Sequence, residues 1–461
     1  MAFVFYDTET TGTDIWFDQI LQFGAIRTDD DLNEVDRFEI RCRLLPHVTP
    51  SPKALEVTGV DPLSLLSTEL PSHYEAISEV HGRLSDWSPS IFIGYNSIRF
   101  DESLLRQAFF QTLHPIYLTN TGGNTRADVL RMAYAVGAFA PNVMSIPIGE
   151  SDRPVFKLDQ LAPANGFSEH NAHDAMGDVE ATIYMARLIK SRAPHVWERM
   201  ITLSFKQNVL DLLRADPVLC HQTGFPGGRP NYAFVTECGF DPTYDSSRAV
   251  FDLSQDPKPF LDLDEEQLTQ EFKKTGTPLK KVRANAQPIL MPLSSAPQGL
   301  RDLSPALSVI EERASLIADS EPFRQRVGAA LSKLYQDTET SDHVEKRIYD
   351  AFPSNHDAQL MRQFHVTPWE ERMDLVRQMQ DQRFARLGQR LIYFEQPNAL
   401  SVSVRRQLQK DISKRLQGGE GEVAGRTQAQ AKSELNSMLD SWTKKSGRIF
   451  GQRFERLLSG D

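Results

Sequence analysis

The chain of 461 residues is 40% hydrophobic and 25% charged, and its formal net charge is −11. This length and composition predict a globular protein of two or three domains with ordinary cores. The sequence has no run of about 18 apolar residues and no signal peptide after Met1, so neither a membrane span nor export is expected.

The three cysteines, Cys42, Cys220 and Cys238, are too few and too scattered for a disulfide framework or a metal-binding cluster. Isolated cysteines in an odd number indicate buried thiols in a reducing compartment. We therefore expect a cytoplasmic protein.

The charge is distributed unevenly along the chain. Residues 341–461 hold 20 Lys and Arg against 16 Asp and Glu, whereas residues 1–340 hold 31 against 46. An acidic body argues against a generally basic nucleic-acid-binding surface. It can still bind a polyanion when cations gather in one groove or when carboxylates bind divalent metal. Net charge therefore leaves the partner undecided.

The first segment, residues 1–193, alternates strand and helix patterns. Its apolar runs predict a meander of three strands and then a fourth strand, over residues 3–9, 20–28, 37–45 and 90–96. Helical spacing follows over residues 100–113, 126–137 (ending at Gly137), 155–166 (closed by Gly166) and 171–194. Strands followed by helices around one sheet predict an α/β domain.

The remaining chain divides into two further segments. Residues 194–342 are rich in turn residues and short β-like runs, which predicts a mostly β domain with one inserted helix over 262–276. Residues 345–461 predict an all-helical domain, with helices over 369–380, 381–395 and 401–416 and a mobile loop over 416–430.

Two carboxylates stand at the end of the first predicted strand, in the stretch "YDTETTG". Asp7 and Glu9 are two residues apart, so both side chains leave the same face of the strand. Two carboxylates at such a short distance repel each other unless a cation such as Mg²⁺ lies between them. Taken alone, such a pair is more often an incidental feature of a solvated turn.

Two further stretches carry acids at helix starts. Asp101 lies just beyond the fourth predicted strand, where an ordinary helix cap is the alternative explanation. His173 and Asp178 open the last helix of the segment and could face one cleft, although acids there could simply stabilise the helix dipole. Together, four acids and one histidine beside strand ends and helix starts indicate a two-metal phosphodiesterase, with His173 as general base.

The motifs "DTETTG", "GYNSIRFDESLLR" and "NAHDAMGD" resemble the three exonuclease motifs of the DEDD superfamily, in the version that ends in H-x4-D. Together with "KLDQLAPANG" they resemble the exonuclease I family of bacterial single-strand-specific deoxyribonucleases. The resemblance is strongest over residues 1–193 and thin between about 205 and 275. It implies a ribonuclease H-like exonuclease domain over 1–193, an SH3-like domain over 194–342 and a helical C-terminal domain over 345–461.

The resemblance also implies roles for the matching residues. Asp7, Glu9 and Asp178 would hold two Mg²⁺ ions directly, with Mn²⁺ as a substitute, and Asp101 would be the fourth carboxylate at the metals. His173 would be the general base. The residues implied to contact DNA are Glu9, Lys157, Arg106, Arg131, Tyr95 and Tyr117. For the last four of these, a structural role remains equally open.

Three positions depart from the family pattern. Thr8 and Thr11 replace the two aromatic residues of an expected D-Y-E-T-F-G motif, so the grip on the terminal nucleotide could differ. Lys157 stands where an arginine is expected, which keeps a cation but loses bidentate binding of phosphate.

The family resemblance implies Mg²⁺-dependent, processive hydrolysis of single-stranded DNA from the 3′ end, releasing 5′-mononucleotides, in DNA repair and recombination. It also implies a monomer that binds the C-terminal tail of single-stranded DNA-binding protein. One alternative is an RNA-directed DEDD exoribonuclease, which the long remainder of the chain disfavours. Another is an inactive nucleic-acid-binding scaffold, which the presence of all four acids and the histidine disfavours.

Overall fold

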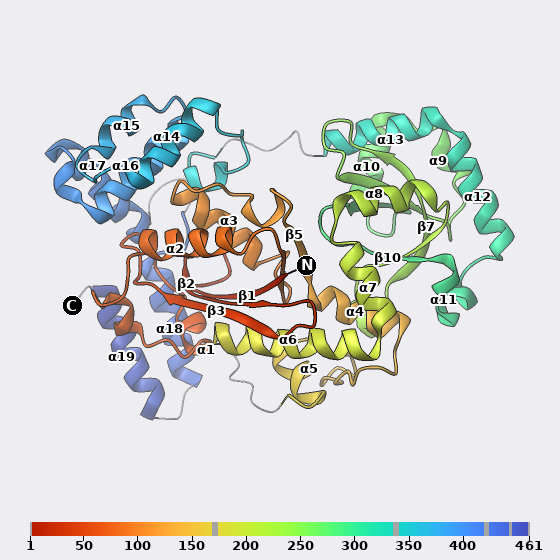
Figure 1. Ribbon diagram of the computed structural model, residues 1–461, viewed down its shortest axis with the longest axis horizontal. Coiled ribbons are helices and arrows are strands. Elements are labelled where there is room, and N and C mark those ends of the chain that lie inside the picture. Colours follow the sequence, from red (N-terminus) through yellow and green to blue (C-terminus); the bar gives the residue numbers. More distant parts are fainter. Residues whose placement is uncertain (1, 168–173, 335–340, 419–423, 442–444, 460–461) are drawn as a thin grey trace.

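A computed structural model describes residues 2–167, 174–334, 341–418, 424–441 and 445–459. The first sheet lies at the centre of Figure 1, the second sheet and its helices to the right, and a helical group at the upper left. None of the helices in these ranges is long and apolar enough to cross a membrane.

The central sheet has five strands in the order β3-β2-β1-β4-β5. Their bounds are β1 (Phe3–Thr10), β2 (Ile20–Thr28), β3 (Glu34–Arg41), β4 (Ile91–Gly94) and β5 (Thr125–Asp128). Strands β1, β2 and β3 form the expected antiparallel meander, and β4 runs parallel to both β1 and β5. The carboxyl ends of β1, β4 and β5 therefore meet at one edge of the sheet.

Strand β5 is where the sequence-based prediction was wrong. A helix was expected from residue 126, but residues 125–128 pair with β4 and the helix α4 (Val129–Phe139) begins after them. Asp128 caps α4 by accepting a hydrogen bond from the Leu130 amide, and Gly137 lies inside the helix instead of ending it. The third strand also begins three residues earlier than expected and ends at Arg41.

Helices cover both faces of the central sheet. Helix α6 (Ala175–Arg192) packs on β1 and β2 from one side, whereas α2 (His73–Asp86) and α3 (Asp101–Gln111) pack on β2 from the other (Figure 1). Alternate residues of β1 enter separate cores: Phe5 packs on the α6 side, and Val4 and Tyr6 pack on the opposite side. The short helices α1 (Pro52–Val57) and α5 (Leu158–Ala164) complete this part.

The second sheet is antiparallel, in the order β10-β6-β7-β8-β9. Its strands are β6 (Leu219–Gln222), β7 (Tyr232–Phe240), β8 (Ser247–Asp252), β9 (Leu279–Arg283) and β10 (Ile289–Pro292). The inserted helix expected over 262–276 is α10 (Glu265–Lys273), preceded by the short α9 (Lys258–Leu261). Both the sheet and this inserted helix are thus confirmed.

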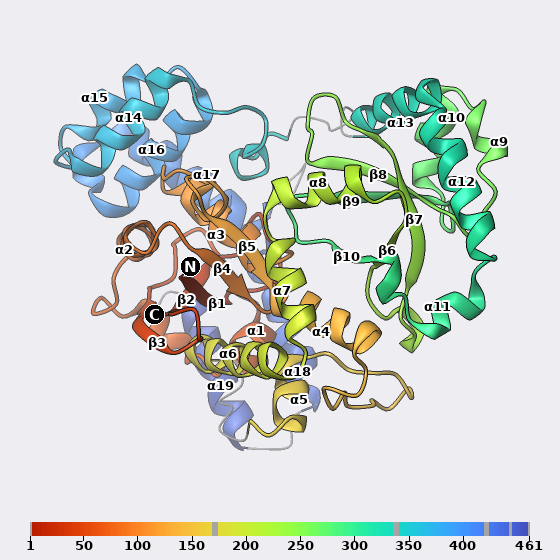
Figure 2. The same cartoon turned by 45° about the vertical axis from the view of Figure 1, so that its right-hand side comes forward.

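This second part contains more helix than expected. Helices α7 (Pro194–Thr202) and α8 (Lys206–Ala215) precede its sheet, and α11 (Gln298–Leu303), α12 (Leu307–Asp319) and α13 (Glu321–Lys333) follow it. Figure 2 shows α12 and α13 beside β7. Phe323, Val327 and Leu331 recur at four-residue spacing and are fully buried, an amphipathic pattern from which α13 could have been predicted.

The C-terminal part is helical, as expected. Its helices are α14 (Asn355–Val366), α15 (Arg372–Gln378), α16 (Gln382–Glu395), α17 (Val402–Gln417), α18 (Gln428–Ser441) and α19 (Lys445–Ser459). Of the loop expected over 416–430, residues 419–423 lie outside the described residues, and its two ends belong to α17 and α18. The domain boundaries near residues 193 and 342 stay predictions.

The last two helices return to the first domain. Phe454 of α19 and Leu435 of α18 are buried in one cluster with Leu55 of α1 and Leu65. Figure 1 shows α18 and α19 beside the central sheet, apart from the other C-terminal helices. Segments several hundred residues apart in the sequence therefore share one apolar core.

We predict that Phe454→Ala will destabilise this core, because it removes a fully buried ring from among its neighbours. The expected loss is about 3–5 kcal/mol, measured by denaturant unfolding and by faster proteolysis of α19. Ile449→Ala, at a side chain on the same helix that is 44% exposed, should change stability by less than about 0.5 kcal/mol. Equal behaviour of the two variants would show that α19 is not held by this contact.

Candidate active site

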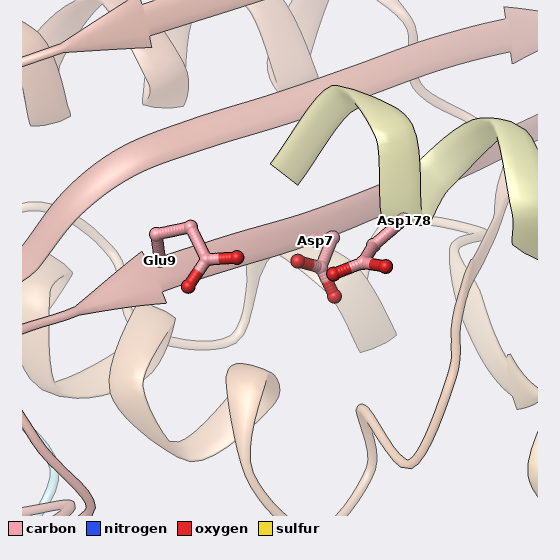
Figure 3. Close-up of side chains that lie close together, drawn as sticks. All are labelled: Asp7, Glu9 and Asp178. Carbon is pink, nitrogen blue, oxygen red and sulfur yellow. The ribbon is translucent and has the colours of Figure 1, made fainter. Parts of the chain in front are cut away.

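Three carboxylates gather where β1 ends beside the start of α6. Asp7 and Glu9 share the strand face of Phe5, which is the face that α6 covers. Asp178 lies in the first turn of α6, and an oxygen from each of the three side chains lies within 4.8 Å of the other two. Figure 3 shows Asp7 and Asp178 close together, with Glu9 further along β1.

Helix α6 is anchored at this position by its own cap. The Asp174 side chain accepts a hydrogen bond from the Gly177 amide and thereby caps the helix. It also accepts hydrogen bonds from Gln22 Nε2 at 2.9 Å and from Arg41 Nη2 at 2.7 Å, which tie the helix start to β2 and β3. These contacts place Asp178 opposite Asp7.

Burial and the nearby carboxylates both raise the pKa values of Asp7 and Glu9. Burial raises the pKa of Asp7 well above its usual range, and the nearby carboxylates of Asp101 and Asp178 raise it further. Burial, followed by Asp178 and Asp101, raises the pKa of Glu9 to about 8. A divalent cation among these oxygens would offset the repulsion, and an all-oxygen donor set suits a hard ion such as Mg²⁺.

Asp101 borders this cluster from the other face of the strand. It is the first residue of α3, is 4% exposed and accepts a hydrogen bond of 2.6 Å from Thr8 Oγ1. Burial raises its pKa to about 7, against the lowering effect of the Thr8 hydroxyl. Its oxygens are not among those within 4.8 Å of one another, so its role as a direct metal ligand stays a prediction.

His173 lies outside the described residues, immediately before Asp174. Its role as general base therefore stays a prediction. The described start of α6 nevertheless follows it directly, so His173 is adjacent in the chain to the helix that carries Asp178.

A cleft of about 1070 Å³ opens beside the carboxylates. Asp7 and Asp178 line it, together with Lys157 and Tyr95 of the first domain and the loop 223–226 of the second. The Lys157 side chain is exposed, whereas the Tyr95 hydroxyl donates a hydrogen bond to the Phe156 carbonyl. The cleft is thus walled by two domains and has the carboxylates and one lysine at its surface.

The sequence and the fold match known exonucleases. A family model described as Exonuclease matches residues 4–186, and one described as Exonuclease I SH3-like domain matches residues 204–335. Exodeoxyribonuclease I of Escherichia coli (strain K12) is 29% identical over 376 residues, which cover 78% of each chain. The chain belongs to the exonuclease I family.

The three-dimensional comparison agrees. The structure of a moderately thermophilic Exonuclease I from Methylocaldum szegediense covers 100% of this chain and 99% of its own, at 25% identity and a TM-score of 0.88. The fold class expected from the sequence is confirmed, and as an exonuclease I family member the chain is a phosphodiester hydrolase.

The two threonines that depart from the exonuclease I pattern make defined contacts. Thr8 points to the α3 side of β1 and donates to Asp101, as described above. Thr11 is fully buried and donates to Asp18 Oδ1 at 2.7 Å, which holds the turn after β1. Hydroxyl groups therefore stand at both positions where the family pattern has aromatic side chains, one within β1 and one just after it.

Three of the residues predicted to contact DNA make internal contacts instead of lining the cleft. Arg106 pairs with Glu102 at 2.8 Å and stacks over the Tyr117 ring. Arg131 donates to the Ala286 carbonyl at 2.6 Å, and Tyr117 borders a separate, mostly apolar pocket of about 260 Å³. These contacts give the three residues structural roles, and their DNA contacts stay predictions.

The sequence analysis missed Asp128, which is buried at the end of β5. It accepts hydrogen bonds from the Asn96 amide at 2.9 Å and the Ile98 amide, in the loop that leads to Asp101. Burial raises its pKa, and its charge is one of the causes that raise the pKa of Asp101. An aspartate before an apolar helix is a cap signal that could have located the end of β5.

We predict that Asp7→Asn lowers nuclease activity by about 10³-fold or more, because the amide cannot hold a divalent cation as a carboxylate does. The circular dichroism spectrum should remain that of the wild type. Glu69→Gln, at an exposed loop acid, is the control and should retain full activity. Activity within tenfold of wild type in the Asp7 variant would exclude this carboxylate from the mechanism.

We further predict that metal-free protein loses stability as the pH rises from about 5 to 8. The pKa of Glu9 is raised to about 8 in the folded protein, so the folded state keeps this proton at pH values where the unfolded state has lost it. The resulting stabilisation is fully present below the ordinary pKa of a glutamate and is lost as the pH rises towards 8. Thermal unfolding in EDTA should show a falling midpoint over this range, and Mg²⁺ should raise the midpoint more at pH 8 than at pH 5. The Glu9→Gln variant should have a flatter pH dependence; an identical slope would contradict the assignment.

Proposed function

We propose that this chain removes 5′-mononucleotides stepwise from the 3′ end of single-stranded DNA, with two Mg²⁺ ions as cofactors. The observation that carries the proposal is the cluster of Asp7, Glu9 and Asp178, of which Asp7 and Asp178 line a cleft between two domains. The volume of the cleft, about 1070 Å³, accommodates a nucleotide and its neighbour.

We assign the roles of the side chains from the sequence motifs and, for the described residues, from their positions in the structure. Asp7, Glu9 and Asp178 would hold the ions, and Asp101 would support them from the α3 side. Divalent ions at such a site supply charge stabilisation for the attacking and leaving oxygens of an in-line displacement. His173 would accept the proton of the attacking water. Lys157 would contact a phosphate, which adds affinity without reading sequence.

The substrate class is supported by a relative. Exonuclease I of E. coli has been solved in complex with a dT13 oligonucleotide, and that structure covers 99% of this chain and 98% of its own, at 25% identity and a TM-score of 0.85. The wall formed by residues 223–226 narrows the cleft from the side of the second domain. We infer that this wall favours a single strand over a duplex and contributes to processivity.

The remaining parts of the proposal concern the cellular setting. We infer a cytoplasmic monomer that acts in DNA repair and recombination. A structure of SSB/Exonuclease I in complex with an inhibitor, at 23% identity, supports an interaction with the tail of single-stranded DNA-binding protein. An RNA-directed exoribonuclease is disfavoured by the SH3-like domain of exonuclease I, and an inactive scaffold by the retained carboxylates.

Digestion of a 5′-labelled oligonucleotide tests the proposal. Single-stranded DNA, duplex DNA and single-stranded RNA are incubated with Mg²⁺ or with EDTA. We expect a ladder that shortens from the 3′ end on single-stranded DNA alone, and none in EDTA or with Asp7→Asn. Preferential loss of RNA would assign the chain to the exoribonucleases, and binding without digestion would make it a scaffold.

A further inference from the structure

The turn that follows β9 in the second domain inserts against the end of β5 in the first. Gln287 is fully buried there, and its backbone φ of 47° lies in the left-handed region. Its Oε1 accepts a hydrogen bond of 2.8 Å from the Asp128 amide, and its Nε2 donates to the Met200 carbonyl at 3.0 Å. The side chain thus joins β5 to α7 from inside the domain interface.

The backbone of the same turn also accepts hydrogen bonds from two arginines of the first domain, including one of 3.4 Å from Arg131 Nη1 to the Gln287 carbonyl. The Asn285 carbonyl accepts from Arg126 Nη2 at 3.0 Å, and the Ala286 carbonyl accepts from Arg131 Nη1 at 2.6 Å. Arg126 and Arg131 lie on either side of Asp128 in the chain. Three consecutive residues of the second domain therefore hold the β5–α4 junction.

This junction in turn holds both sides of Asp101. Before it, the Asp128 carboxylate accepts the amides of Asn96 and Ile98, in the loop that leads to Asp101. After it, Arg126 Nη1 donates to Glu102 Oε1 at 3.0 Å, and Glu102 follows Asp101 directly. Two hydrogen-bonded routes thus run from the turn to the residues that flank the fourth carboxylate.

We propose that Gln287, with the turn of residues 285–287, positions Asp101 against Thr8 and Asp7, so that the second domain helps to assemble the active site as well as bordering the cleft. This inference rests on the proposed function, because it takes Asp101 as part of the catalytic site. Displacement of a catalytic group by about 1 Å can cost on the order of 10²-fold in rate. Gln287 contacts neither the cleft nor the carboxylates, so it acts as a positioning residue.

A second contact between the same two domains provides the control. Thr125, at the start of β5, donates from Oγ1 to the Ser204 carbonyl. Thr125→Val removes one buried hydrogen bond between the domains, whereas Gln287→Met removes the bond to the Asp128 amide at the other end of the strand and the bond to the Met200 carbonyl. On β5 the two hydrogen bonds are made at Thr125 and at Asp128, which are three residues apart, about 10 Å along an extended strand. Any effect specific to Gln287→Met therefore reports on the Asp128 junction, not on the interface in general.

The first experiment measures amide hydrogen exchange without any substrate. In Gln287→Met, the Asp128 amide loses its acceptor, and we expect exchange of the peptide 94–104 to become at least about tenfold faster than in wild type. Thr125→Val should leave this peptide unchanged. Unchanged exchange in Gln287→Met, or equal acceleration in both variants, would overturn the proposal.

The second experiment separates chemistry from DNA binding. Single-turnover hydrolysis of a 12-nucleotide DNA strand by excess enzyme gives a maximal rate and a half-saturating enzyme concentration. We expect Gln287→Met to lower the maximal rate by about 10- to 100-fold with less than a twofold change in half-saturation. Thr125→Val should match wild type in both values. A changed half-saturation with an unchanged maximal rate would make the turn a DNA-binding element and refute the positioning role.

The two readouts distinguish failure of this inference from failure of the proposed function. If wild-type protein does not digest single-stranded DNA, the proposed function fails, whereas the exchange experiment still tests the link to the loop before Asp101. If Gln287→Met does not fold, Gln287→Asn withdraws the amide oxygen from Asp128 by one methylene and is measured in the same way.

Discussion

The concentration of negative charge at the end of β1 is the constraint on which the rest of the structure depends. Oxygens of Asp7, Glu9 and Asp178 lie within 4.8 Å of one another, and burial together with the neighbouring carboxylates of Asp178 and Asp101 raises the pKa values of Asp7 and Glu9. Such an arrangement needs a rigid support, because the electrostatic repulsion between the carboxylates would fall if they moved apart. Burial of β1 by helices on both faces supplies that support, and the Asp174 cap holds α6 in place.

The second domain is integrated with this support instead of being attached to it by a flexible link. Helix α7 begins two residues after α6 ends and packs against α4 and α6, and Trp197 and Met200 enter the core of the first domain. The turn of residues 285–287 closes the same interface at the end of β5. The cleft walls are therefore parts of one packed unit, which suits a site that depends on the separation of a few oxygens.

Local sequence patterns predicted the features that depend on local geometry. The two-residue period of a strand predicted that the side chains of Asp7 and Glu9 share one face. The position of Asp178 was predicted from the start of the helix that carries it. Strand β5 was missed because its four residues, "TRAD", run without a break into an apolar helix. Gln287 could not be found at all, since its partner Asp128 is 159 residues away and nothing in its own loop marks it. For the same reason, the sequence did not show that Arg106 faces the buried Glu102 of its own helix and not solvent.

The return of α18 and α19 to the first domain has a consequence for synthesis on the ribosome. Leu55 and Leu65 are made several hundred residues before Leu435 and Phe454, which pack with them in one cluster. At a synthesis rate of roughly 5–20 residues per second, the apolar surface around Leu65 stays exposed for about 20–80 s before α19 is made. The nascent chain therefore exposes an apolar patch on its first domain until α19 has left the ribosome, and termination before α19 would leave that patch accessible to chaperones and proteases.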